Sequence, residues 1–269
     1  MNRELVRLLR GRTGAVLHEG PSLLDGAPIV VIATALKPRG KNANSKTGDA
    51  VQTWILRRDM LPIDAVRSGD DASICGDCFH RAGPGRLRSC YPDIRMPSKV
   101  WHAYTRNTYL RVHPSELEPI LAVRPFRAGS YGDPAAAPPE LWAWAKQHAP
   151  LFWGYTHQWH LKVAEPLRAL GLMASVESEH EAEHAQALGW RTFRVRPEAT
   201  KWGAAHDRPC PADTLWAKAT NRKRTTTCVQ CQACAPGGTR NITVTAHGGA
   251  RRQLVNRLVA HKRLPVLAA

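Results

Sequence analysis

Seven cysteines are the residues of this chain best suited to chemistry. A chain of 269 residues that is 43% hydrophobic can bury a core without disulfide bonds, and a reducing compartment keeps thiols free. Metal or redox chemistry is therefore the preferred interpretation. The cysteines form a first group of Cys75, Cys78 and Cys90 and a second group of Cys210, Cys228, Cys231 and Cys234.

The first cysteine group has three thiols within one predicted loop. Cys75-x-x-Cys78 places two sulfurs on a tight turn, and Cys90 follows 12 residues after Cys78. A fourth ligand is either His80 or absent, so the spacing fits both a Cys₃His zinc site and an iron–sulfur cluster. Three protein ligands leave a coordination position open, which makes this group the candidate for catalysis.

The second cysteine group has four thiols and the stronger signature. Cys228-x-x-Cys231-x-x-Cys234 resembles the run of bacterial ferredoxins, and Cys210-Pro211 resembles the distant Cys-Pro that accompanies it. Four thiolates close a site completely, and closed sites are mostly structural. A Cys₄ zinc site is the alternative to a second cluster.

The elements that must position these groups alternate between short apolar runs and helical patterns. Strands separated by single helices imply parallel pairing, either in a doubly wound sheet or in a barrel. Six repeats favour an α/β fold built as an incomplete parallel (βα)6-type barrel with Cys-rich metal-binding loops. The predicted strands cover 29–35, 51–56, 123–130, 151–156, 172–176, 191–195 and 242–246, and the predicted helices cover 98–106, 139–148, 161–170, 179–188 and 250–263.

Three segments follow from this pattern. Residues 1–50 hold a strand and a basic loop over 37–48, residues 51–248 form the barrel-like domain with both cysteine groups, and residues 249–269 form a basic C-terminal helix. Ser178 and Glu181 match a capping box at the start of one helix, and Gly189 stands just past its end.

Polar residues follow several predicted strands, where the loops of a barrel would converge with the Cys75 loop on one rim. Each has an ordinary explanation: Asp133 can cap a helix, Glu177 can occupy a first turn, and His157 can be a buried histidine with satisfied hydrogen bonds. As a set they favour a site. The candidates are Gly129, Gly132, Asp133, His157, Glu177 and His247.

The net charge of +16 is concentrated at one end of the chain. Residues 191–269 hold 15 Lys and Arg against 3 Asp and Glu, whereas residues 1–190 hold 23 against 19. A basic surface can bind phosphate backbones, and it can also simply keep a protein soluble. No run approaches the roughly 20 apolar residues of a membrane span, and the first residues lack a signal peptide's apolar stretch. We therefore expect a cytoplasmic protein that does not contact membranes.

Taken together, these motifs resemble a bacteriophage family of largely unassigned function, the gene-product-eighty-eight-like proteins. The resemblance implies a phage-encoded protein in the cytoplasm of an infected bacterium. It rests on Asn44-Ser-Lys-Thr-Gly48, Val51-Gln-Thr-Trp-Ile-Leu56, Cys75-x-x-Cys78 with Cys90-Tyr91, Gly129-Ser-Tyr-Gly-Asp-Pro134, Gly154-Tyr-Thr-His-Gln-Trp159, Gly189-Trp-Arg-Thr-Phe-Arg-Val195 and the second cysteine group.

A looser resemblance links the chain to radical S-adenosylmethionine enzymes, through a strand, a three-cysteine loop and a Gly-Asp-Pro turn after the next strand. It implies a [4Fe–4S] cluster at the first cysteine group and a second centre at the other. Gly129, Gly132 and Asp133 would then approach S-adenosylmethionine. His157, Glu177 and His247 would handle an unidentified small-molecule or macromolecular substrate.

A rival interpretation makes both cysteine groups structural zinc sites in a nucleic-acid-binding protein. Its basic C-terminal third would then follow phosphates, and binding would weaken steeply as salt rises.

Overall fold

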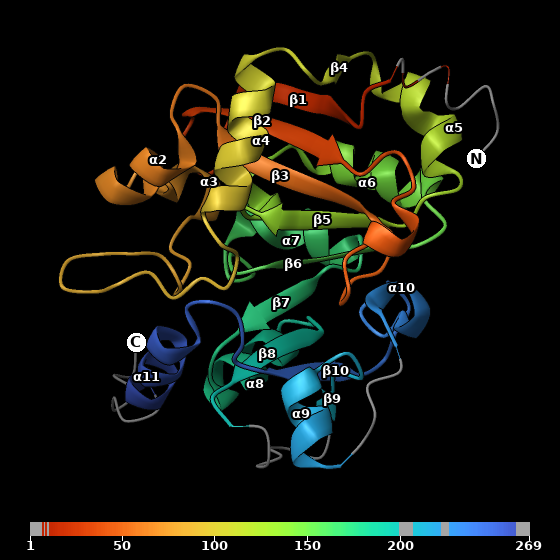
Figure 1. Ribbon diagram of the computed structural model, residues 1–269. Coiled ribbons are helices and arrows are strands. Elements are labelled where there is room, and N and C mark those ends of the chain that lie inside the picture. The colour runs from red at the N-terminus through yellow and green to blue at the C-terminus, as the bar shows by residue number, and fades with distance from the viewer. Residues whose placement is uncertain (1–6, 8, 10, 199–206, 222–225, 262–269) are drawn as a thin grey trace.

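A single ten-stranded sheet forms the centre of the computed structural model, which describes residues 7, 9, 11–198, 207–221 and 226–261. The strand order is β4-β1-β2-β3-β5-β6-β7-β8-β10-β9, and the sheet stays open because β4 and β9 are its edges (Figure 1). The predicted α/β class is confirmed.

The first part of the sheet is antiparallel. Strand β1 (Gly14–Pro21) pairs with β2 (Pro28–Thr34), and β2 pairs in turn with β3 (Val51–Arg57). The short β4 (Leu110–Arg111) adds to β1 in parallel. Residues 14–34 therefore share one sheet with the strands that follow them.

From β3 onward the strands run parallel and follow chain order. Strand β5 (Phe126–Tyr131) is followed by β6 (Phe152–Thr156), β7 (Met173–Val176), β8 (Thr192–Arg196) and β10 (Asn241–Thr245). Strand β9 (Asp207–Pro209) pairs with β10 at the far edge. All six strands of this parallel series were predicted from the sequence.

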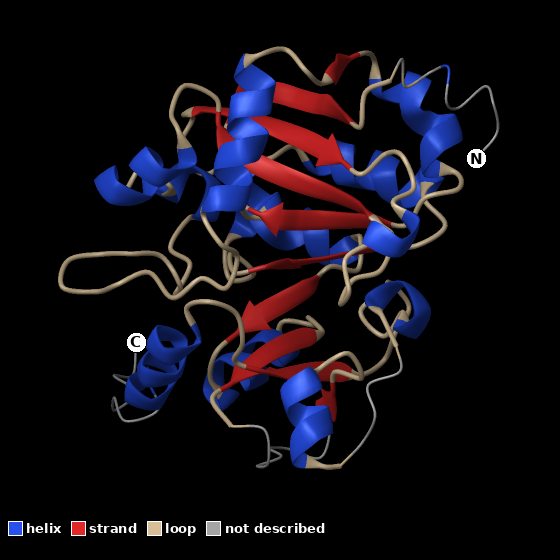
Figure 2. Ribbon diagram, in the orientation of Figure 1, coloured by secondary structure: helices blue, strands red, loops and turns tan. Residues whose placement is uncertain are grey.

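Helices flank the sheet on both sides (Figure 2). Helix α4 (Arg95–Thr105) crosses in front of β2 and β3 in Figure 1, whereas α6 (Pro139–His148) and α7 (Glu165–Ala169) lie behind the sheet. The remaining helices are α2 (Pro62–Ser68), α3 (Ala72–Cys75), α5 (Glu118–Leu121), α8 (Glu179–Ala187), α9 (Thr214–Ala219), α10 (Cys228–Cys231), α11 (Arg251–His261) and the 3-10 turns η1 (Gly40–Asn42), η2 (Pro114–Leu117), η3 (Pro134–Ala136) and η4 (Lys162–Ala164).

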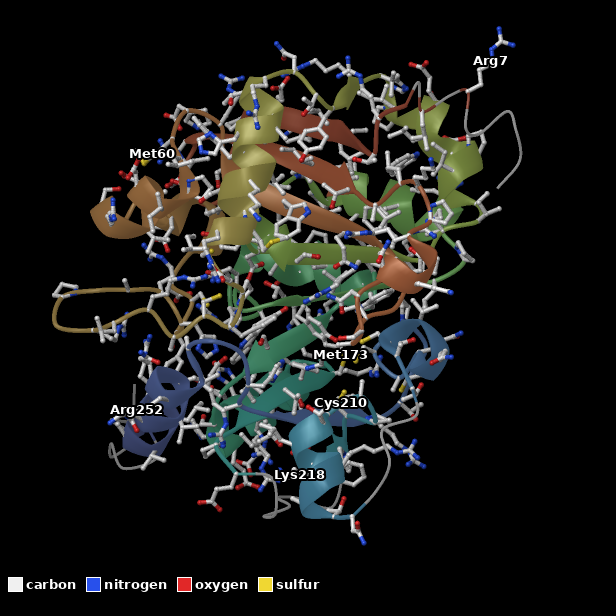
Figure 3. All side chains as sticks on the ribbon, viewed as in Figure 1. Arg7, Met60, Met173, Cys210, Lys218 and Arg252 are labelled. Atoms are coloured by element: carbon white, nitrogen blue, oxygen red, sulfur yellow. The ribbon has the colours of Figure 1, made fainter. Side chains whose placement is uncertain are left out.

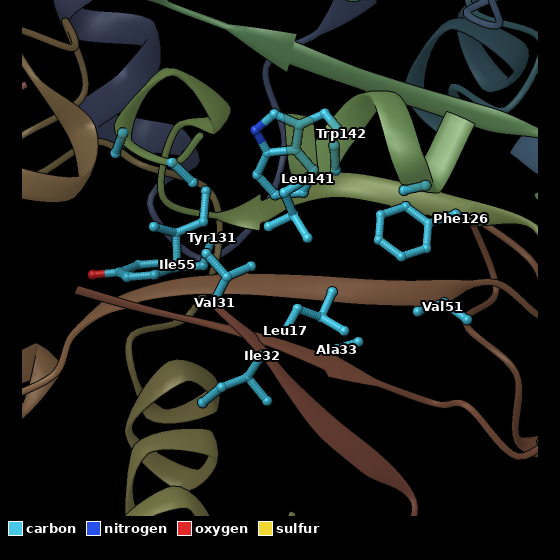
Figure 4. Close-up of a cluster of buried hydrophobic side chains, with 14 of the residues drawn as sticks. Leu17, Val31, Ile32, Ala33, Val51, Ile55, Phe126, Tyr131, Leu141 and Trp142 are labelled. Carbon is cyan, nitrogen blue, oxygen red and sulfur yellow. The ribbon is translucent and has the colours of Figure 1, made fainter. Parts of the chain in front are cut away.

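The largest apolar core lies between the sheet and α6. Phe126 and Trp142 are fully buried, and Figure 4 shows Leu141 and Trp142 directed at the strands. Ile32 projects from the opposite face, toward α4 (Figure 4). Apolar burial on both faces explains why β2 reads as a continuous Val and Ile run rather than as an alternating pattern.

Some predicted boundaries were wrong. The strand predicted over 123–130 begins at Phe126, because Pro125 has no amide hydrogen to donate and Val123 is 58% exposed. The helix predicted over 161–170 is a 3-10 turn followed by the short α7. The helix predicted over 250–263 is α11 (Arg251–His261), and residues 262 and 263 lie outside the described residues.

The capping box of α8 is confirmed, with the Ser178 hydroxyl accepting from the Glu181 amide. Part of the basic C-terminal third lies outside the described residues, namely Lys201, Arg222, Lys223, Arg224, Lys262 and Arg263. Among the described helices, none has the length and apolar character needed to cross a membrane.

Candidate functional site

A cavity of about 300 Å³ lies against one face of the parallel strands and is called the main cavity here. Side chains two residues apart face it, as the two-residue period of a strand requires. Strands contribute Arg127, Gly129 and Tyr131 from β5, Trp153 and Tyr155 from β6, Phe193 and Val195 from β8 and Val244 from β10.

The first cysteine group lines the main cavity with all three of its thiols. Cys75 ends α3, and Gly76 then turns the chain with φ +56°, where a Cβ would meet the Gln158 side-chain oxygen at 2.2 Å. The Gln158 amide donates to the Cys75 carbonyl at 3.0 Å, which seats the loop on the end of β6. The loop after α3 projects at the left of Figure 1, and Leu87 within it is 74% exposed.

Arg81 holds this loop in place through hydrogen bonds. Its guanidinium donates to Asp71 at 2.9 and 2.7 Å and to the Gly76 carbonyl at 2.7 Å. Asp71 is 3% exposed. The turn that carries Cys75 and Cys78 is therefore fixed by buried, charge-assisted hydrogen bonds.

Burial favours the protonated thiol at Cys75 and Cys90 in the absence of a cation. It raises the pKa of Cys75 well above its ordinary value, with the nearby Cys78 adding to the shift. It also raises the pKa of Cys90 to about 11. A bound metal would replace these protons, because thiolates are the form that binds metals.

Asp133 connects the first cysteine group to β6. Its amide donates to the Ile74 carbonyl at 2.6 Å, and its carboxylate accepts from the Thr156 hydroxyl and the His157 amide, both at 2.7 Å. It also caps η3 through the Ala135 amide. Burial raises the pKa of Asp133 despite these hydrogen bonds. Asp133 lines the cavity as predicted, but both of its carboxylate oxygens are engaged, so its role is to position His157.

The two glycines predicted to approach a cofactor also line the main cavity. Gly129 has φ +67° and Gly132 has φ +76°. A Cβ on Gly132 would meet the Ile55 carbonyl oxygen at 2.7 Å. Close packing against β3 therefore accounts for this glycine without any ligand.

Glu177 stands at the end of β7 and is 5% exposed. Its Oε1 atom lies 3.1 Å from Nε2 of His157 and 3.1 Å from Nε2 of His80. Glu177 was predicted to face the cavity, but it is not among the residues that line it and instead contacts two histidines that do. His80 and His157 line the cavity in its place.

The charge states of His80, His157 and Glu177 depend on burial and on the charged groups beside them. Burial lowers the pKa of His80, so that imidazole is neutral. Burial also opposes charge on His157, but Cys78 and Glu177 outweigh it and raise the pKa of His157 well above its usual value. Burial favours the neutral acid of Glu177, yet His157 and His80 hold the pKa of that carboxyl below its usual range.

The second cysteine group surrounds a smaller space of about 40 Å³, called the second cavity here, which all four thiols line. Helix α10 begins in a capping box made by Thr227 and Gln230. Cys210 follows β9, and its amide donates to the Thr243 carbonyl at 2.8 Å (Figure 3). Cys228 lines both cavities.

Burial raises the pKa of Cys210 to about 11 and that of Cys234 to about 12. The Tyr155 hydroxyl hydrogen-bonds Cys234. This tyrosine faces both cavities and so forms part of the wall between them.

The basic loop over 37–48 is only partly the solvated segment expected from the sequence. Thr47 is buried, and the carbonyls of Lys46 and Thr47 accept from the amides of Cys228 and Val229 at 2.9 and 3.1 Å. The loop thus reaches the second cysteine group. The Lys46 side chain enters both cavities.

Sequence reasoning missed two charged residues of the cavity wall, Arg127 and Lys46. Arg127 donates to the Tyr91 hydroxyl at 2.6 Å, and its Nε atom has no partner among the described residues. Lys46 belongs to a segment that looked like open loop. The alternation of Arg127, Gly129 and Tyr131 along β5 was the available signal, once that strand's inner face was known.

No protein-family model, curated protein or solved structure matches this chain, so its own geometry is the basis for assigning it a function.

Proposed function

We propose that this chain is an iron–sulfur protein with a [4Fe–4S] cluster at each cysteine group, and that the first cluster is open to a substrate. The observation that carries the proposal is the grouping of the cysteines: those of the first group line the main cavity, and those of the second line the second cavity, with Cys228 lining both. Two groups of cysteines, each lining a cavity, are a suitable donor set for iron.

The cysteine sulfurs lie farther apart than the four ligands of a single zinc ion would. Four thiolates on one zinc ion, with bonds of about 2.3 Å, lie roughly 3.8 Å apart. Among the described residues, the one group of three or more ligand atoms within 4.8 Å of one another is His80, His157 and Glu177, so no three cysteine sulfurs come that close. Thiolates of a cluster lie farther apart because each binds a different iron.

The strand order supports an incomplete (βα)6 barrel as the scaffold. The six parallel strands from β3 to β10 follow chain order without the reversal that marks a doubly wound sheet. Loops at their carboxyl ends carry the first cysteine group, Asp133, His157 and His247 to one cavity. Active sites of parallel barrels lie at this end.

The resemblance to radical S-adenosylmethionine enzymes suggests the reaction class. An open iron with S-adenosylmethionine bound would supply one-electron chemistry. The chain's own residues would do the rest: Trp153, Tyr155 and Phe193 exclude water, and His157 holds a proton beside Cys78. Here the first cysteines are separated by two and eleven residues, so binding of S-adenosylmethionine needs its own test.

The proposal is tested by purifying the full chain without oxygen and measuring iron, acid-labile sulfide and visible absorption. We expect brown protein with about eight irons per chain, as two [4Fe–4S] clusters require. Addition of S-adenosylmethionine should change the electron paramagnetic resonance spectrum of the reduced first cluster. Colourless protein that contains only zinc would overturn the proposal.

The basic surface carries the second candidate, a zinc-stabilised nucleic-acid-binding protein of the infected bacterial cytoplasm. Arg251 and Arg252 are exposed on α11, and Figure 3 shows Arg252 at the outer side of that helix. In this case zinc would fill both cysteine groups, and affinity for duplex DNA would fall with salt at a slope of about −0.9 for each phosphate contacted. The second candidate would be ruled out if the protein contains iron and its affinity for DNA does not change with salt concentration.

A further inference from the structure

We propose that His80, His157 and Glu177 form a separate binding site for one divalent first-row transition metal ion, distinct from both cysteine groups. The site would use two imidazole nitrogens and one carboxylate oxygen. This donor set is the one found in His₂Glu zinc enzymes and in 2-His-1-carboxylate iron proteins.

The Glu177 oxygen is already at coordination spacing from both histidine nitrogens. Nε2 of His80 and Nε2 of His157 each lie 3.1 Å from Oε1 of Glu177, and all three atoms lie within 4.8 Å of one another. Neighbouring ligands on an ion with bonds of about 2.1 Å are roughly 3.0–3.4 Å apart. An ion could therefore enter with little rearrangement.

The surroundings hold two of the three ligands in place. Nδ1 of His80 lies 3.2 Å from the Ser89 hydroxyl, so Nε2 is the nitrogen directed at the site. The Glu177 amide donates to Glu181 at 2.7 Å, at the junction of β7 and α8. A histidine whose second nitrogen is held in this way is typical of metal sites.

The carboxylate of this site is buried and is paired with imidazoles. Glu177 is 5% exposed, and its ion-pair partners within the described residues are the two histidines alone. A buried charge is costly unless it is paired. A divalent ion would displace the proton between Glu177 and an imidazole and take over that pairing, whereas the partly exposed His148–Glu118 pair, at 3.4 Å, is open to solvent.

The open coordination positions would face the main cavity. His80 and His157 line it, and Glu177 lies behind them. Three protein ligands leave room for water or for a ligand in the cavity. The ion would therefore be accessible from the same space as the first cysteine group.

The experiment is a titration of the full chain with Mn²⁺, followed by electron paramagnetic resonance. Mn²⁺ prefers oxygen and nitrogen ligands to thiolates, so it reports on this site and not on the cysteines. The protein is first dialysed against a chelator to remove labile ions. We expect one Mn²⁺ per chain, at least a tenfold loss of affinity in Glu177→Gln and His80→Ala, and about the same loss in Ser89→Ala.

The control variant is His148→Ala, which removes a histidine from an exposed carboxylate pair and should bind Mn²⁺ as the unaltered chain does. Circular dichroism establishes that each variant is folded, and two ligand positions are tested in case one variant is not. Failure of the unaltered chain to bind Mn²⁺, or unchanged affinity in folded Glu177→Gln or His80→Ala, would overturn the site. Iron and sulfide contents are measured on the same samples, so loss of the clusters and loss of this site are told apart.

Discussion

Nζ of Lys46 lies 2.8 Å from Nε2 of His247, although 201 positions separate the two residues. Nδ1 of His247 lies 2.7 Å from the Thr245 carbonyl, which can only accept, so Nδ1 carries the hydrogen and Nε2 accepts from Lys46. Lys46 precedes β3 and His247 follows β10, the first and last strands of the parallel series. The contact therefore joins both ends of that series at the wall of the main cavity.

Replacement of Lys46 by Met should raise the pKa of His247. Burial is the first cause that lowers this pKa and the Lys46 charge is the second, so removing the charge moves the value up toward 6.5. Loss of the hydrogen bond should lower the free energy of unfolding by about 0.5–1.5 kcal/mol. The pKa is measured by NMR of the imidazole. Lys41→Met, at an exposed position of the same loop, is the control and should leave it unchanged.

Replacement of Asp133 by Asn should destabilise the protein by about 1–3 kcal/mol. The carboxylate accepts from the Ala135 and His157 amides and from the Thr156 hydroxyl. An amide nitrogen in that place must meet at least one of these donors with another donor. Chemical denaturation measures the loss, and the exposed Asp77→Asn serves as the control. Equal stability of the two variants would show that the Asp133 network contributes little.

The Asp49–Arg124 pair should give a specific pH dependence. The hydrogen bond from Arg124 is the main cause that lowers the pKa of Asp49 below its usual 3.8. A carboxyl with a depressed folded-state pKa stabilises the protein above its unfolded-state pKa, and the stabilisation is lost as pH falls below about 3.8. Because Arg124 is only 5% exposed, Asp49→Asn should cost about 1–3 kcal/mol at pH 7. The difference from the unaltered chain should shrink in denaturation curves recorded toward pH 3, and a constant difference would contradict this assignment.

The two cysteine groups should respond differently to single replacements. Cys231→Ala should lower the melting temperature, by roughly 2–4 °C for each kcal/mol lost, because closing a thiolate site is coupled to folding. Cys78→Ala should remove iron from the first group while the fold and the second centre remain. Calorimetry and iron analysis of both variants give the comparison. Equal loss of folding in Cys231→Ala and Cys78→Ala would contradict the assignment of an open first site and a closed second site.

The parallel series could be predicted from the sequence because each of its strands is a short apolar run between helical patterns. Strand β1 was not predicted, because His18, Glu19 and Gly20 interrupt its apolar run. Its hydrogen bonds to β2 place it in the sheet. The convergence of strand-end residues followed from parallel topology alone.

The cluster of His80 and Glu177 could not be predicted in the same way. The two residues are 97 positions apart, and their meeting depends on how the loop after α3 returns across the end of β7. The spacing of residues along the chain does not predict the path of this loop. His80 was considered only as a neighbour of the first cysteine group, and its bond to Glu177 is a property of tertiary packing.

Along β5 and β6, adjacent residues face opposite sides of the sheet, one packed against neighbouring elements and the next lining the main cavity. Ala128 belongs to the apolar core, and a Cβ at Gly154 would meet Ala128 at 2.9 Å, so these two positions allow little change. Arg127 and Tyr155, one step away on each strand, face the main cavity. Substitutions at Arg127 and Tyr155 can therefore change which molecule fits the main cavity, while Ala128 and Gly154 preserve the packing of the strands. Selection for a new ligand need not begin by weakening the fold.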